Sequence, residues 1–189
     1  MNTFTFSVAA PKRSFLNEFF KFAGILVFIA SANLTSAQSI KALADNKIYT
    51  FNASSPSKLI GSPIVISGLN FGQSLVGMDY NPSTGELIGL GYNASNNTGR
   101  LYSINTTNGA LTPIGLTTIN IQLGNGPVGF DFNPVANRIR VIGANNKNYR
   151  LNPVSGEVAA IDSNLKYKTA DVNAGKNPFI GTCAYTNSY

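Results

Sequence analysis

Short apolar runs alternate with polar turns along residues 38–189, and this pattern predicts strands rather than helices. In the clearest stretch, an apolar run ends at Asp131-Phe-Asn-Pro134, where Asn and Pro favour a turn. The following segment, Arg138-Ile-Arg-Val-Ile142, alternates and is rich in β-branched residues, as expected of a strand. No amphipathic helical period of useful length occurs after residue 37. The chain is therefore predicted to be all-β.

Similar segments recur along this region. Val76-Gly-Met-Asp-Tyr-Asn-Pro82 returns as Val128-Gly-Phe-Asp-Phe-Asn-Pro134, and each copy is followed by a second apolar strand. A second series is centred on Tyr49, Tyr102 and Tyr149, each with an Asn three residues later and another strand after a turn. A unit of about 50 residues with four short strands is typical of a propeller blade. The recurring tyrosines are expected to pack in the core between blades.

The number of units predicts an incomplete array. A propeller closes with about four to eight blades, whereas residues 38–189 supply two full units and two partial ones. Ile40–Ile66 has the pattern of the later strands of an earlier unit, and Ile180–Asn187 that of the opening strand of a following one. We therefore expect a propeller-like array of four-stranded blades, truncated at the C-terminus. A β-sandwich made from the same hairpins is the alternative.

Residues 1–37 have the pattern of a secretory signal peptide. The basic residues Lys12, Arg13 and Lys21 precede a short apolar run over residues 22–30, and the small residues Ser36 and Ala37 precede the expected cleavage point. A membrane-spanning helix needs about 20 apolar residues. We therefore expect a secreted, periplasmic or cell-surface protein, with no membrane span after cleavage.

Composition excludes several kinds of chemistry. The sequence has no histidine and one cysteine, which removes Ser-His-Asp triads, His-ligated metals, cysteine clusters and internal disulfides. Cys183, in an apolar strand-like run, is interpreted as a small buried hydrophobe. Eleven basic and seven acidic residues follow residue 37 without forming a basic run, so nucleic-acid binding is not expected.

The remaining carboxylates include two at corresponding positions, Asp79 and Asp131. Residues that recur in this way belong to the scaffold, and we expect both to accept hydrogen bonds from turn amides. Asp171 and Asn173 begin a segment with calcium-ligand character, but the twelfth position of an EF-hand would be Thr182. A looser calcium site and an Asx-stabilised loop stay open as alternatives.

Three arginines form the candidate binding group. Arg138 and Arg140 face the same side of one strand because side chains alternate, and Arg150 is expected on the neighbouring strand. Guanidinium groups so placed could hold a carboxylate or sulfate of a polymer. The alternative is a solvated sheet face or pairing with Asp131 and Glu157.

Several segments together resemble a known family. They are Gly129-Phe-Asp-Phe-Asn-Pro134, Asn137-Arg-Ile-Arg-Val141, Tyr149-Arg-Leu-Asn-Pro153, Asp171-Val-Asn-Ala-Gly175 and Ala184-Tyr-Thr-Asn187. They resemble the signature segments of the domain of unknown function 4394 family (DUF4394), over about residues 40–189. The resemblance implies an exported bacterial protein with a propeller-like all-β domain, and it supplies no catalytic residues.

These observations lead to a hypothesis of function and two alternatives. The first is an exported, non-enzymatic binding or scaffold module for an extracellular polymer or surface protein, without a cofactor. The second is an extracellular polysaccharide hydrolase or lyase that uses a pair of carboxylates. The third is a calcium-dependent adhesion module.

Overall fold

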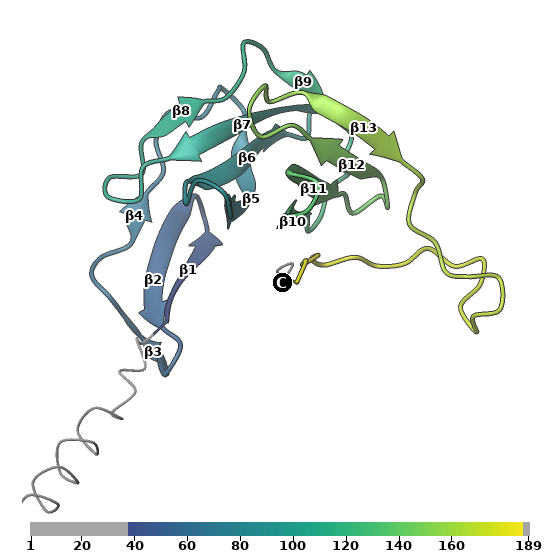
Figure 1. The fold of residues 1–189 in the computed structure, drawn as a ribbon, viewed down its shortest axis with the longest axis horizontal. Helices are drawn as coiled ribbons and strands as arrows, with labels where there is room; N and C mark the ends of the chain where they lie inside the picture. The colour runs from purple at the N-terminus through teal and green to yellow at the C-terminus, as the bar shows by residue number, and fades with distance from the viewer. Residues whose placement is uncertain (1–37, 187–189) are drawn as a thin grey trace, which may run out of the picture. The chain divides into compact units, whose positions relative to one another are not determined.

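The computed structural model describes residues 38–186, so the predicted signal peptide lies outside the described residues. This part of the chain forms three antiparallel sheets in sequence order (Figure 1). Sheet 1 contains β1 (Ser39–Ala44), β2 (Lys47–Asn52), β3 (Ser55–Leu59) and β4 (Ile64–Val65). Sheet 2 contains β5 (Ser74–Tyr80), β6 (Leu87–Asn93), β7 (Thr98–Ile104), β8 (Leu111–Pro113) and β9 (Ile119–Asn120). Sheet 3 contains β10 (Gly129–Asn133), β11 (Arg138–Ile142), β12 (Asn148–Leu151) and β13 (Val158–Asp162).

Each sheet is a meander of consecutive strands. Sheets 2 and 3 follow the orders β5-β6-β7-β8 and β10-β11-β12-β13. In sheet 1, β1-β2-β3 correspond to the last three strands of such a meander, and β4 pairs with β2 as β9 pairs with β7. The all-β prediction is confirmed, and the meanders have the strand order expected of blades. Closure into a propeller, and the sandwich alternative, stay predictions. Over residues 38–186, no helix is long and apolar enough to span a membrane.

Asparagine side chains stabilise one set of turns. Asn81 follows β5 and Asn133 is the last residue of β10. The side-chain oxygen of each accepts the backbone N–H two residues later (2.9 and 3.1 Å). Asn105 and Asn152 do the same at the turns after β7 and β12 (2.9 Å each). An Asn side chain that bonds its own backbone two residues on mimics a turn, so the predicted Asn-based turns form where the sequence places them.

A second set of turns uses asparagine backbone instead. Asn46, Asn97 and Asn146 occupy the hairpins β1–β2, β6–β7 and β11–β12 with φ of 53°, 56° and 65°. Asn tolerates this left-handed region better than most residues. Each of the three carbonyls accepts a 2.9 Å hydrogen bond from an apolar residue of the chain that leaves the sheet: Ile66, Ile121 and Leu165 respectively. The chain therefore leaves all three sheets in the same way.

The core lies between successive sheets. One cluster joins sheets 2 and 3 and includes Leu90, Leu101, Ile139 and Leu151, all fully buried. A smaller cluster joins sheets 1 and 2: Ile48, Ile66, Leu75, Leu87 and Ile104. Tyr102 and Tyr149 are also buried, which confirms their predicted core role, whereas Tyr49 is half-buried.

The chain after β13 makes a long loop and returns to β10 (Figure 1). The sequence predicts an opening strand over 180–187, and this prediction is wrong for residues 180–186, which are not in a strand. A strand requires a ladder of backbone hydrogen bonds, and these residues pair with no strand of the described chain. The backbone N–H of Tyr185 instead donates to the side chain of Asp131 in β10.

Candidate functional site

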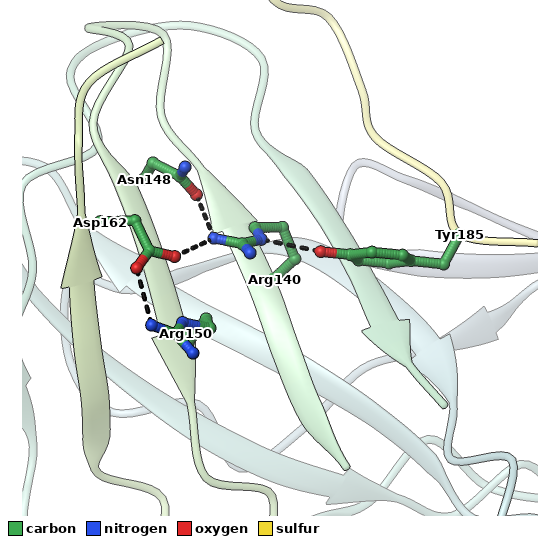
Figure 2. A network of polar contacts seen from close by, with 5 residues as sticks. All are labelled: Arg140, Asn148, Arg150, Asp162 and Tyr185. Atoms are coloured by element: carbon green, nitrogen blue, oxygen red, sulfur yellow. Dashed lines mark hydrogen bonds and ion pairs between the residues drawn. The ribbon is translucent and has the colours of Figure 1, made fainter. Parts of the chain in front are cut away.

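Two of the three candidate arginines meet in one polar network on sheet 3 (Figure 2). Arg140 of β11 and Arg150 of β12 are direct cross-strand partners. Arg150 Nη2 donates to Asp162 Oδ1 at 2.8 Å, and Arg140 Nη1 donates to Asp162 Oδ2 and to Asn148 Oδ1, the latter at 2.7 Å. Arg140 Nε donates to the Tyr185 hydroxyl at 3.0 Å. The guanidinium of Arg140 is thus largely used within the protein.

The third arginine points elsewhere. Arg138 Nη1 donates to the carbonyl of Asn137 at 2.7 Å. The expected pairing of the arginines with Asp131 and Glu157 is wrong, because the register places Asp162 opposite Asn148 and beside both guanidinium groups. Hydrogen bonds from Arg150 and then Arg140 hold the pKa of Asp162 below its ordinary value.

The polar character of this face distinguishes sheet 3 from sheet 2. In sheet 2 the register gives Ile88 the position of Arg140, and Leu101 the position of Asn148. Ile88 and Leu101 are buried against sheet 3. The same face therefore forms a dry core in sheet 2 and a hydrogen-bonding surface in sheet 3.

Asp79 in β5 contacts β10, and Asp131 in β10 contacts the chain after β13. The N–H of Phe132 in β10 donates to Asp79 Oδ2 at 2.9 Å, and the N–H of Tyr185 donates to Asp131 Oδ2 at 2.6 Å. The predicted role of both aspartates as hydrogen-bond acceptors is confirmed. The prediction that the donors are amides of the local turn is wrong, because Phe132 and Tyr185 lie 53 and 54 residues away from the aspartates they contact. Asp79 also accepts the N–H of the adjacent Tyr80. The turn amides are satisfied by the neighbouring asparagines, which frees the aspartates for this contact.

A glycine two residues before each aspartate permits the close approach. A Cβ at Gly77 would lie 2.5 Å from Phe130 Cβ, and a Cβ at Gly129 would lie 3.0 Å from Cys183 Sγ. Cys183 therefore packs against Gly129 in the same way that Phe130 packs against Gly77. The thiol is half-buried rather than buried, and burial, with the charge of Asp131, raises its pKa to about 11. It is protonated at neutral pH, as expected of an unreactive cysteine.

The carboxyl group of Asp131 titrates unusually high. Burial raises its pKa to about 6, opposed by the Tyr185 N–H and assisted by the neighbouring Asp79. Because the folded pKa exceeds the unfolded value of 3.8, the native state binds more protons between about pH 4 and pH 6. The free energy of unfolding therefore falls as the pH rises through this window and stays lowered above it.

Asp131→Asn is expected to remove this pH dependence. The variant keeps an oxygen for the Tyr185 N–H but carries no charge. The thermal midpoint of the variant minus that of the native protein should rise between pH 4 and pH 6.5 and then level off. Thermal unfolding of both proteins from pH 4 to pH 8 measures this difference. A difference that is constant across the range would contradict a raised pKa for Asp131.

The calcium candidates lie in the loop that follows β13. Asp171 Oδ1 accepts the N–H of Asn173 at 2.8 Å, which is the Asx turn of the alternative prediction. Asn173 Oδ1 accepts from the Lys176 ammonium at 3.3 Å, a contact that disfavours a cation there. In the described part of the chain, no three His, Cys, Asp or Glu residues converge as a metal site.

Four cavities lie at the connections between strands and in the loop that follows β13. Two involve the β6–β7 turn and the chain after β8, with volumes of about 380 and 340 Å³. The other two lie along the chain after β13 and measure about 350 and 530 Å³. Their linings are rich in Asn and Lys. Neither Asp79 nor Asp131 lines any of these four cavities.

One protein family matches most of the chain. A family model described as "Domain of unknown function (DUF4394)" matches residues 47–189. The chain belongs to the DUF4394 family. This match confirms the resemblance drawn from the segments in and after β10. No curated protein matches the sequence significantly.

Sequence reasoning missed two features of this DUF4394 domain. The sequence pattern does not pair Asp162 with Arg140 and Arg150, although its place directly after the apolar run Val158–Ile161 is a usable signal. Lys166, Lys168 and Lys176 were not singled out because they do not form a continuous basic run. The loop brings these lysines together around one cavity.

Proposed function

We propose that this DUF4394 protein is an exported, non-enzymatic binding module whose repeated sheets present a surface to an extracellular polymer. The signal-peptide pattern of residues 1–37 supports export, and the family resemblance supports a bacterial source. The observation that carries the non-enzymatic part is the use of the aspartates. Asp79 and Asp131 hold backbone amides of the following segment, and Asp162 is held by two arginines.

A binding role also agrees with the cavities. Their linings offer amide and ammonium groups, which recognise hydroxyl and carboxylate groups without reacting with them. Buried apolar clusters hold the three sheets together. A rigid scaffold that carries polar loops at one end is a common arrangement for recognition.

Thermal unfolding with a ligand panel tests the proposal. We expect at least one extracellular glycan, neutral or anionic, to raise the midpoint of the full chain, because a ligand that binds only the folded state stabilises it. Millimolar calcium in a parallel sample tests the adhesion alternative. If no glycan and no surface polymer shifts the midpoint, the binding proposal is wrong.

One observation favours the alternative of a carboxylate-dependent polysaccharide hydrolase or lyase. Asp131 has a pKa raised to about 6, and Asp79 lies close enough to contribute to that shift. A carboxyl group of raised pKa beside a second carboxyl group is a pair that glycoside hydrolysis can use. Release of new sugar ends from a polysaccharide, lost in Asp131→Asn and in Asp79→Asn, would establish this alternative.

A further inference from the structure

The positive charge of the domain is concentrated in sheet 3 and the loop after it. Residues 138–176 contain seven basic and three acidic residues, whereas residues 38–137 contain four of each. Two of the three acids are already engaged: Asp162 pairs with Arg140 and Arg150, and Asp171 accepts the amide of its own turn. Asp171 keeps its charge, so the three lysines of the loop exceed its one carboxylate by two positive charges.

Three of these lysines line one cavity, which we call the lysine cavity. It has a volume of about 530 Å³ and is lined by Lys166, Lys168 and Lys176, with Tyr167, Thr169 and Asn177. No carboxylate lines it. Three ammonium groups and two hydroxyl groups around one space provide hydrogen-bond donors for an anionic group such as a carboxylate or sulfate.

Backbone hydrogen bonds fix the shape of this loop. The N–H of Asp171 donates to Lys168 O at 3.0 Å, and the N–H of Ala174 donates to Asp171 O at 2.9 Å. The N–H of Lys176 donates to Asn173 O at 2.9 Å. The backbone positions of Lys168 and Lys176 are thus set before a ligand arrives, which lowers the entropic cost of binding.

A second cavity, which we call the amide cavity, adjoins the first and shares Asn177 with it. Its volume is about 350 Å³, and its lining includes Asn145, Asn164 and Phe179. Phe179 is 84% exposed, so its ring is accessible to a ligand at this cavity. Carboxamides can pair with vicinal hydroxyl groups, and an exposed aromatic ring offers an apolar face to the C–H groups of a pyranose.

We propose that the amide and lysine cavities form one binding site for an acidic polysaccharide. A sugar ring occupies the amide cavity against Phe179, and the carboxylate of a neighbouring sugar occupies the lysine cavity. The inference rests on the proposed function and names its ligand class. A polysaccharide fits better than a nucleic acid because it presents hydroxyl groups along its whole length, which the carboxamide of Asn164 can bind.

Isothermal titration of the full chain with polygalacturonate tests the site. The variant Lys166→Gln/Lys168→Gln/Lys176→Gln should bind about tenfold more weakly or worse, since it loses three ammonium groups from one cavity. The control Lys41→Gln/Lys47→Gln/Lys58→Gln removes the same net charge from sheet 1 and should bind as the native protein does. Phe179→Ala should weaken binding roughly fivefold without lowering the thermal midpoint, because the ring is exposed.

The outcomes separate the site from the function. Binding of polygalacturonate that both lysine variants reduce equally would indicate general electrostatic attraction and overturn the site. Binding of neutral dextran alone would also overturn it while leaving the proposed function intact. Duplex DNA bound as tightly as polygalacturonate would overturn the polysaccharide assignment. No binding to any glycan or to any other surface polymer would overturn the proposed function as well.

Discussion

Gly109→Ala is expected to destabilise the fold by about 2–5 kcal/mol. Gly109 has a φ of +76°, where a side chain costs about 1–2 kcal/mol. A Cβ there would lie 2.1 Å from the carbonyl oxygen of Val65 and 2.9 Å from Ile64 Cγ2. The clash adds about 1–3 kcal/mol because Ile64 and Val65 belong to β4, whose pairing with β2 restricts their movement.

A matched control exists at another turn of the same sheet. Gly85 has a similar φ of +73°, but nothing lies within 4 Å of a Cβ there. Gly85→Ala should therefore lose only the conformational part, about 1–2 kcal/mol. Urea unfolding of both variants measures the difference. Equal losses of unfolding free energy in the two variants would contradict the prediction, because they would show that β4 moves away from the added methyl group without destabilising the fold.

Tyr102→Ala should cost about 3–5 kcal/mol, the range for removing a large buried aromatic ring. Tyr102 is fully buried. Its hydroxyl donates to Gln73 Oε1 at 2.7 Å and accepts the N–H of Asn70 at 3.2 Å. Tyr102→Phe keeps the ring and should cost about 1–3 kcal/mol, because Gln73 Oε1 and the Asn70 N–H lose their partner.

Tyr49 provides the control for this prediction. It has the position in β2 that Tyr102 has in β7, but it is only half-buried. Tyr49→Ala should therefore cost distinctly less than Tyr102→Ala in the same denaturant titration. Comparable losses would show that burial between sheets 1 and 2 is not what makes Tyr102 important.

The strand pattern was predictable because it depends on local chemistry. Alternating apolar residues in Arg138–Ile142 predict a strand with a buried side, and Ile139 and Val141 are buried as expected. Turns at Asn81 and Asn133 follow from the ability of an Asn side chain to bond its own backbone. The position of Arg150 on the strand next to that of Arg140 was also predictable, since adjacent strands of a meander pair.

The partners across sheets were not predictable in this way. An alternating pattern shows which residues share a face, but not which residue of another segment packs there. Asp79 was therefore assigned to its own turn, although it accepts the amide of Phe132 in the next sheet. The expected strand at 180–187 failed for a related reason: local propensity cannot supply a ladder partner.

By itself, the sequence determined the all-β class, the strand and turn positions, the family and the exclusion of histidine chemistry, because each depends on residue type and short-range spacing. Only the tertiary structure decided that Asp131 holds Tyr185, that Asp162 pairs with both Arg140 and Arg150, and that three separated lysines line one cavity. These contacts depend on how sheets stack and how the long loop folds back. Such positions are set by the packing of the whole domain rather than by any local segment.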